Sequence, residues 1–280
     1  NAGSVTSSLF KAGGLIGHVD KGIQIIQSYN TGSVTADDEA GGLVGYLQTK
    51  EHAEVSSRDN GIEVANSYNT GSVTGGGSAG GLVGSSDGYI KIDHSYNSGS
   101  VIGDHAAGGL AGEAFYNIEV IQSYNLAVIS GNTVGGLMGR SYQEISINQS
   151  FNAGSVLGGG SVGGLAGVSD NITINQSFNT GSVTGEWGVA GMASVAHGRM
   201  RINQSFSTGL ITGVGNMGGL VYSFAYFDNI ENSYWAVDSS AQTLSSGSSE
   251  DDGYVGLALA VLQCAVQADT NSENSDCVSN

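Results

Sequence analysis

Residues 80–107 read GGLVGSSDGYIKIDHSYNSGSVIGDHAA, and residues 108–134 read GGLAGEAFYNIEVIQSYNLAVISGNTV. Both segments open on Gly-Gly-Leu and carry Ser-Tyr-Asn near their middle. Tandem repeats of this length are typical of solenoids, in which each repeat buries its apolar face only by stacking on its neighbours. The two segments therefore predict one structural coil in about 28 residues.

The same two elements mark the repeat along most of the chain. Gly-Gly-Leu begins at Gly13, Gly41, Gly80, Gly108, Gly135, Gly163 and Gly218, and Ala190-Gly191-Met192 takes its place once. Ser-aromatic-Asn begins at Ser28, Ser67, Ser95, Ser123, Ser150 and Ser177, with relaxed copies at Ser205 and Ser233. The regular spacing of these two motifs predicts an all-β fold, a parallel β-helix (β-solenoid) of about eight coils of ~28 residues with a short C-terminal cap. We assign residues 1–238 to the solenoid, with an insertion in coil two near 48–60, and residues 239–280 to a Ser-rich acidic loop and a capping segment.

Three short strands are expected in each coil: the Gly-Gly-Leu run, an Ile-x-Ile run and the Gly-Ser-Val-Thr run. Stacked coils place like residues on like, so each position becomes a column along the axis. An aliphatic column is predicted from Val34, Val73, Val101, Val128, Val156 and Val183. An aromatic column of Tyr29, Tyr68, Tyr96, Tyr124, Phe151, Phe178, Phe206 and Tyr234 is predicted to lie in the interior. The asparagines that follow these rings are predicted to pair along the axis and to satisfy buried polar groups.

The charge of the chain excludes one large class of partner. The chain has 25 acidic and 8 basic residues, a net charge of −17, so it lacks the basic face that nucleic acid requires. The same charge disfavours anionic membranes, and no apolar run approaches the length of a membrane span. Glycine supplies 47 residues and proline none, which fits a fold with many tight corners. We therefore expect neither nucleic-acid binding nor membrane insertion.

The two cysteines, Cys264 and Cys277, lie close together in a polar C-terminal segment. We favour a disulfide between them, which implies an oxidising compartment. A zinc site would need more ligands than this segment provides. Any export signal is expected upstream of this sequence, because no signal peptide lies within it.

The repeat resembles a known family. The recurring G-G-L-V-G, the segment S-Y-x-x-G-S-V-T-G and the closing Ser233-Tyr234-Trp235 are similar to GLUG-type repeats over roughly residues 1–263. Such repeats occur in large bacterial adhesins, hemagglutinin-like proteins and IgA-specific metallopeptidases, and the resemblance concerns their repeat region, without a catalytic domain. It implies a β-helical stalk or display module that is secreted or held at the bacterial cell surface, with a role in cell adhesion.

Ionisable and aromatic residues outside the columns are the candidates for binding. The insertion in coil two has the densest group, with Lys50, His52, Glu54 and Arg58, and a loop in coil six carries Trp187, whose ring can stack on a sugar when exposed. Two carboxylate runs are candidates for weak calcium binding, namely Asp37, Asp38 and Glu39, and Glu250, Asp251 and Asp252. Glu113 and Arg140 occupy the same position in consecutive coils, which predicts a surface salt bridge.

No catalytic residue and no cofactor other than calcium is predicted. The H-E-x-x-H motif of zinc peptidases is absent, and the many G-x-G strings are coil corners. The prediction is a non-catalytic extracellular structural or binding module, the stalk or display surface of an adhesin-like protein. Its expected partners are a glycan or protein ligand at a cell surface, domains upstream and downstream in the same polypeptide, or another copy joined end to end.

Two other classes of protein stay open as alternatives. The first is a carbohydrate-active enzyme, a polysaccharide lyase or hydrolase built on a β-helix, which would need a base with calcium ligands or a pair of carboxylates. The second is a self-assembling extracellular filament subunit, which the open strand edges of a first coil would favour.

Overall fold

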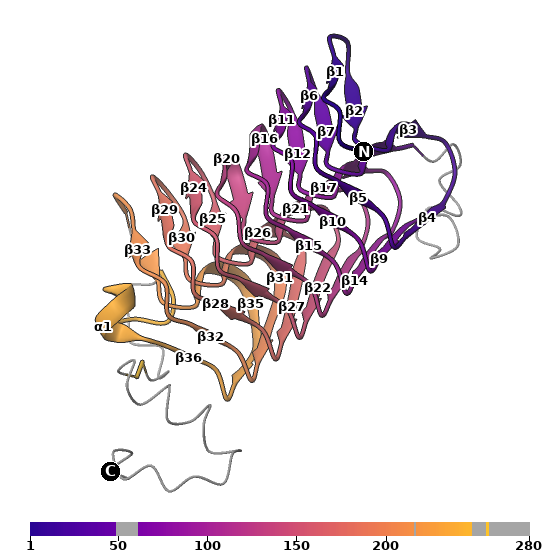
Figure 1. Ribbon diagram of the computed structural model, residues 1–280. Coiled ribbons are helices and arrows are strands. Elements are labelled where there is room, and N and C mark those ends of the chain that lie inside the picture. Colours follow the sequence, from indigo (N-terminus) through magenta and orange to yellow (C-terminus); the bar gives the residue numbers. More distant parts are fainter. Residues whose placement is uncertain (49–60, 216, 248–255, 258–280) are drawn as a thin grey trace, which may run out of the picture.

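The chain forms a parallel β-solenoid, as the repeat predicts. The computed structural model describes residues 1–48, 61–215, 217–247 and 256–257. About eight turns of ~28 residues stack along one axis, and the strands of each turn pair in parallel with those of the next (Figure 1). A coil of this length returns to its starting point one strand spacing, about 4.8 Å, further along the axis, so like residues pair with like.

The first of three sheets forms one arm of every coil. Its leading strands are β1 (Val5–Ser7), β6 (Val34–Ala36), β11 (Val73–Gly75), β16 (Val101–Gly108), β20 (Ile129–Gly135), β24 (Val156–Gly158), β29 (Val183–Gly185) and β33 (Ile211–Thr212). It folds back through β2 (Lys11–Gly13), β7 (Glu39–Gly41), β12 (Ser78–Gly80), β25 (Val162–Gly163), β30 (Val189–Ala190) and β34 (Met217–Gly218). Strands β16 and β20 run through both parts of this arm.

The other two sheets form the second arm. One contains β3 (Ile16–Val19), β8 (Val44–Leu47), β13 (Val83–Ser86), β17 (Ala111–Ala114), β21 (Met138–Ser141), β26 (Ala166–Ser169), β4 (Ile23–Ile26), β9 (Ile62–Ala65), β14 (Ile90–Asp93), β18 (Ile118–Ile121), β22 (Glu144–Asn148), β27 (Asn171–Asn175), β31 (Ala193–Asn203) and β35 (Val221–Glu231). The other contains β5 (Tyr29–Asn30), β10 (Tyr68–Asn69), β15 (Tyr96–Asn97), β19 (Tyr124–Asn125), β23 (Phe151–Asn152), β28 (Phe178–Asn179), β32 (Phe206–Ser207) and β36 (Tyr234–Trp235). A short helix, α1 (Val237–Ser240), follows the last coil.

The Gly-Gly pair forms a corner between two strands, which corrects the prediction that Gly-Gly-Leu is itself a strand. Strand β7 ends at Gly41 and β8 begins at Val44. A Cβ atom on Gly41 would lie 1.8 Å from the carbonyl oxygen of Val44, and one on Gly42 would lie 2.0 Å from that of Gly81. The backbone of this coil leaves no room for a Cβ atom at either position, which favours the glycines that recur there along the chain. One coil has alanine, Ala190, at the first position.

Each arm has its own apolar core. The first arm is filled mainly by valine and alanine, among them Val34 and Ala40. The second arm contains more of the larger side chains, such as Leu43, Ile62 and Met138. In the core of the first arm the larger aliphatic residues are few, and its isoleucines are Ile129 and Ile211.

A buried ladder of asparagines joins the two arms. Asn30, Asn69, Asn97, Asn125, Asn152 and Asn179 are all 0% exposed. From Asn30 to Asn152, each Nδ2 donates to Oδ1 of the next asparagine at 2.8–2.9 Å. Each also donates to the carbonyl two residues further along its own coil. The predicted axial pairing of the asparagines is therefore confirmed, and it satisfies polar groups that have no access to water.

The aromatic column lies on the outer surface, so the prediction of an interior column is wrong. Rings from Tyr29 to Phe206 stack with centroids 4.9–5.2 Å apart. Successive side chains of a strand point to opposite faces, and Asn30 occupies the inner face. Its neighbour Tyr29 is therefore directed outward and is 49% exposed, and the other rings are half-buried.

The prediction is also wrong for Val128, which it assigns to the buried valine column. Ile129 pairs with Val101 and Val156 and is 0% exposed, whereas Val128 is 47% exposed. The buried aliphatic residue lies five positions after the ring in this coil, as it does in the others. Counting from Tyr124 therefore gives Ile129.

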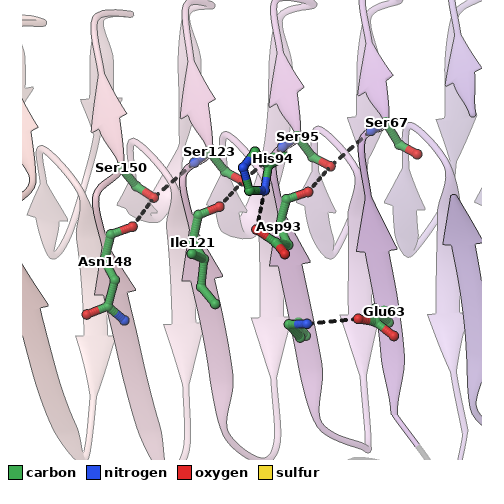
Figure 2. A network of polar contacts seen from close by, with 10 residues as sticks. Glu63, Ser67, Asp93, His94, Ser95, Ile121, Ser123, Asn148 and Ser150 are labelled. Carbon is green, nitrogen blue, oxygen red and sulfur yellow. Dashed lines mark hydrogen bonds and ion pairs between the residues drawn. The ribbon is translucent and has the colours of Figure 1, made fainter. Parts of the chain in front are cut away.

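A left-handed corner precedes each aromatic residue. Gln27, Asn66, His94, Gln122, Gln149, Gln176, Gln204 and Asn232 have φ between 45° and 50°. The serine that follows the corner stabilises it, as Figure 2 shows for Ser95, whose Oγ donates to the carbonyl of Asp93 at 2.8 Å. The same Oγ accepts a hydrogen bond from the N–H of Ser67 at 3.1 Å. The pattern repeats at Ser123 and Ser150 and forms a second ladder along the axis.

Candidate functional site

Ionisable side chains from several coils meet in the inner angle between the two arms, at the Gly-Gly corner. We call this group the inner-elbow cluster, and it comprises Lys11, Glu39, Tyr46, Ser78, Asp87, His105, Glu113, Arg140 and Tyr142. Strands β2, β7, β12 and β16 supply one wall, and β8, β17 and β21 with the turns that follow β13 and β21 supply the other. Close contact across the angle explains why Tyr46, which points away from the core, is only 8% exposed.

Glu113 lies at the centre of the cluster. Its carboxylate accepts a hydrogen bond from Ser78 Oγ at 2.8 Å and lies 3.9 Å from Nδ1 of His105. The Tyr142 hydroxyl also donates to it, and partial burial together with the negative charge of Glu113 raises the pKa of Tyr142. Glu113 is 8% exposed and is therefore not the surface residue that the sequence predicts.

The predicted salt bridge between Glu113 and Arg140 does not form within the described part of the chain, although the two residues are register neighbours. The Arg140 guanidinium lies 4.5 Å over the Tyr142 ring and 3.3 Å from Nε2 of His105. The Glu113 carboxylate is instead held by Ser78 of the opposite wall. Glu113 therefore bonds to a residue of the opposite arm, Ser78, and not to Arg140, its neighbour in the next coil.

Glu39 has a carboxylate oxygen that is not satisfied. Its Oε2 is buried and has no hydrogen-bond partner among the described residues. Lys11, its register neighbour in β2, places its ammonium group 3.4 Å from the centre of the Tyr46 ring. Burial and the negative charge of Asp38 raise the pKa of Glu39 from 4.5 to about 6, although Lys11 acts in the opposite direction.

Tyr46 is held in place from the other side of the cluster. Its hydroxyl donates to Asp87, and burial together with this hydrogen bond raises the pKa of Tyr46. The ring also lies 5.6 Å from that of His18, at a tilted angle. The phenol therefore stays protonated and acts as a wall of the cluster.

Glu39 and Glu113 are two of the three carboxylates of the inner elbow. Glu113 accepts from Ser78, which lies in the coil after Glu39, and the charge of Glu113 adds to the rise in the pKa of Glu39. A carboxyl group with a raised pKa near a second carboxylate is a combination that glycoside hydrolases use. Access to solvent is poor, however, because Ser78 is 3% exposed and Oε2 of Glu39 is buried. The cluster therefore acts first as a polar link between the two arms.

The residues that the sequence singles out are dispersed over the molecule. Trp187 lies between β29 and β30 and is 65% exposed, which confirms its predicted place on an exposed loop. Asp37 is exposed at the turn between β6 and β7, whereas Glu39 belongs to the inner-elbow cluster. Within the described ranges, no three His, Cys, Asp or Glu side chains are grouped in a way that could hold a metal ion. Calcium binding by Asp37, Asp38 and Glu39 stays a prediction.

The other predicted site residues lie outside the described residues. They are Lys50, His52, Glu54 and Arg58 of the insertion, Glu250, Asp251 and Asp252 of the acidic loop, and Cys264 and Cys277. Their roles in ligand binding, calcium binding and disulfide formation stay predictions.

The inner-elbow cluster is not predicted from the sequence, and a partial signal for it exists. Lys11 and Glu39 share one column, and Glu113 and Arg140 share another. Each of these two columns can be identified from the repeat in the sequence. Only the folding of the chain at the Gly-Gly corner brings one column opposite the other. The angle of that corner depends on packing in both arms, which no single repeat encodes.

Comparison with protein-family models, curated proteins and solved structures found no match to this chain. Among the residues that the structure describes, no helix has the length and apolar character needed to cross a membrane.

Proposed function

We propose that this chain is a non-catalytic extracellular module, the stalk or display surface of a bacterial adhesin-like protein. The observation that carries the proposal is the continuous bonding along the axis, in which the asparagine ladder runs unbroken from Asn30 to Asn179. Each coil also pairs in parallel with the next. Such continuity resists bending between coils, and eight coils at about 4.8 Å each give a rod of about 38 Å.

The division between inner and outer positions also supports a role in display. Along the strands from β4 to β31, the inner column contains only aliphatic residues, as in Ile25, Val64 and Ile92. The residue type in the outer column differs from coil to coil; for example, Glu63 is followed by Lys91 in the next coil. A scaffold with a uniform interior and a varied exterior is suited to carrying binding groups. The resemblance to GLUG-type repeats is consistent with an exported protein of this kind.

A turnover assay tests the non-catalytic part of the proposal. The chain is incubated with neutral and acidic polysaccharides, with and without calcium, and product release is followed over time. We expect binding without sustained turnover. Sustained release of product would replace this proposal with the enzyme alternative.

A polysaccharide hydrolase is the second candidate, because the pKa of Glu39 is raised and the negative charge of Glu113 contributes to that rise. It predicts turnover that is lost in both Glu39→Gln and Glu113→Gln. Lys91→Gln serves as the matched control, since Lys91 is an ion-paired residue on a different face of the same arm. Turnover that survives both glutamate variants would place the chemistry outside the inner elbow.

A further inference from the structure

Two arginines lie side by side on the outer face of the second arm. Arg199 and Arg201 are both exposed on β31, and the residue between them, Met200, is 0% exposed. Because strand residues alternate, both guanidinium groups point to the same outer face, with their Cα atoms about 7 Å apart. The whole chain has 8 Lys and Arg residues against 25 acidic ones, and this pair places two of the eight within three residues of one strand.

A hollow of about 370 Å³ lies beside the arginine pair, and its lining is polar. It is lined by Glu144, Asn171, Thr173, Arg199 and Arg201, which come from three successive coils. Asn171 Oδ1 accepts a hydrogen bond from the backbone N–H of Arg199 at 3.0 Å. This contact orients the amide, so that its NH2 group is the part available to a ligand. The volume falls in the range of small-molecule sites.

We propose that this hollow, the Arg199–Arg201 site, binds an acidic saccharide through a carboxylate or sulfate group on the sugar ring. The planar fork of arginine matches both oxyanions and binds them with paired hydrogen bonds. The Asn171 amide and the Thr173 hydroxyl suit the hydroxyl groups of the same ring, and the Glu144 carboxylate can accept from one more.

Other contacts of the two arginines are compatible with this role. Both make further polar interactions within the protein. A guanidinium group has five N–H donors, so a protein contact uses only part of its capacity. Such contacts also hold the side chains in place and reduce the entropy lost when a ligand binds.

The same outer column offers a comparison within the chain. Lys91 occupies the position of Arg201 four coils earlier, and its Nζ lies 2.9 Å from Glu63. The carboxylate neutralises this lysine, and Gln24 donates to the same carboxylate from the preceding coil. Lys91 is also a single ammonium group, which lacks the two planar forks that the arginine pair offers to an oxyanion, so an anionic ligand is expected at the arginine pair and not at Lys91.

This inference rests on the proposed display function and names the ligand class for it. The test is isothermal titration of the full chain, at low salt, with an oligogalacturonate, a sulfated oligosaccharide and a neutral oligosaccharide of equal length. We expect at least one acidic oligomer to bind and the neutral oligomer not to bind. The two acidic oligomers distinguish a carboxylate from a sulfate as the preferred group.

Variants assign the binding to the site. Arg199→Gln and Arg201→Gln should each weaken binding about tenfold, equivalent to about 1.4 kcal/mol, whereas Lys91→Gln removes the same charge and should leave it unchanged. Circular dichroism checks that each exposed-site variant is folded. Equal affinity for the neutral oligomer, equal loss in Lys91→Gln, or unchanged binding in the double arginine variant would overturn the site. Turnover of a bound oligomer would instead overturn the non-catalytic proposal and leave the site in place.

Discussion

Among single residues, the buried asparagines bear most directly on stability. Asn152 accepts hydrogen bonds from Asn125 and from the N–H of Gly154, and it donates to Asn179 and to the carbonyl of Gly154. Asn152→Leu removes all four bonds and leaves their buried partners unsatisfied. We expect the free energy of unfolding to fall by about 3–5 kcal/mol in chemical denaturation.

The control for this prediction is Ser100→Ala, which alters an exposed serine on the first arm and should change the free energy of unfolding by less than about 0.5 kcal/mol. A loss below about 1 kcal/mol for Asn152→Leu would mean that the coils tolerate a break in the ladder. That outcome would also weaken the proposal of a rigid stalk.

Glu39 should make stability depend on pH. Its pKa is about 6 in the folded chain against an ordinary value of 4.5, so between these values the folded state binds more protons than the unfolded state. The free energy of unfolding therefore falls as the pH rises through this interval, by about 1 kcal/mol once solvent screening of a partly exposed carboxyl is allowed for.

Glu39→Gln should remove this pH dependence of the free energy of unfolding. Above the pKa that Glu39 has in the folded chain, the variant should therefore be more stable than the wild type. Denaturation of wild type and variant across the interval measures the difference in pH slope. An identical slope in both proteins would contradict the assignment of the raised pKa to Glu39.

At the scale of single elements, the left-handed corner before each short aromatic strand is the sharpest constraint on sequence. Gln176 has φ of 48°, a region that glycine adopts freely and β-branched residues avoid. Gln176→Gly should therefore stabilise the chain by about 0.5–1 kcal/mol, and Gln176→Val should destabilise it by about 1–2 kcal/mol. Thermal denaturation compares both variants with Thr180→Val, an exposed position without positive φ. Equal effects of valine at the two positions would argue against backbone strain as the cause.

The outward ring stack makes a different prediction for stability than a buried stack would. Phe178 is half-buried and stacks on Phe151 and Phe206 at 4.9 and 5.0 Å. Phe178→Ala should cost about 1–2 kcal/mol, less than the 3–5 kcal/mol of a fully buried ring. Ile174→Ala, at a fully buried position of the same coil, should cost about 2–5 kcal/mol in the same denaturation assay. A larger loss for Phe178→Ala than for Ile174→Ala would contradict the outward placement.

For the whole molecule, repulsion between acidic side chains opposes the stacking of the coils. The chain has a net charge of −17, and stacking brings the acidic groups of successive coils close together. Raising sodium chloride from about 0.01 to about 1 M shortens the screening length from about 30 to about 3 Å. We therefore expect the melting temperature to rise with salt, and calorimetry measures it. A fall would indicate that ion pairs such as Lys91 with Glu63 contribute more than the repulsion does.

What the sequence alone determined is the part of the fold that depends on length and repetition. The number of coils and their parallel stacking follow from the spacing of Gly-Gly-Leu, because like positions must pair when each repeat closes one turn. The buried pairing of Asn152 and its equivalents follows from the same register. The exposure of Trp187 follows from its place between two strands.

Only the tertiary structure decided which way the side chains face and which columns meet. The outward direction of Tyr29 depends on Asn30 occupying the inner face, and a two-residue strand has too few positions for alternation to be read from sequence. The contact of Ser78 with Glu113 depends on how sharply the Gly-Gly corner folds one sheet onto another. That angle is set by the packing of two separate cores, a property of all the coils together and of no single repeat.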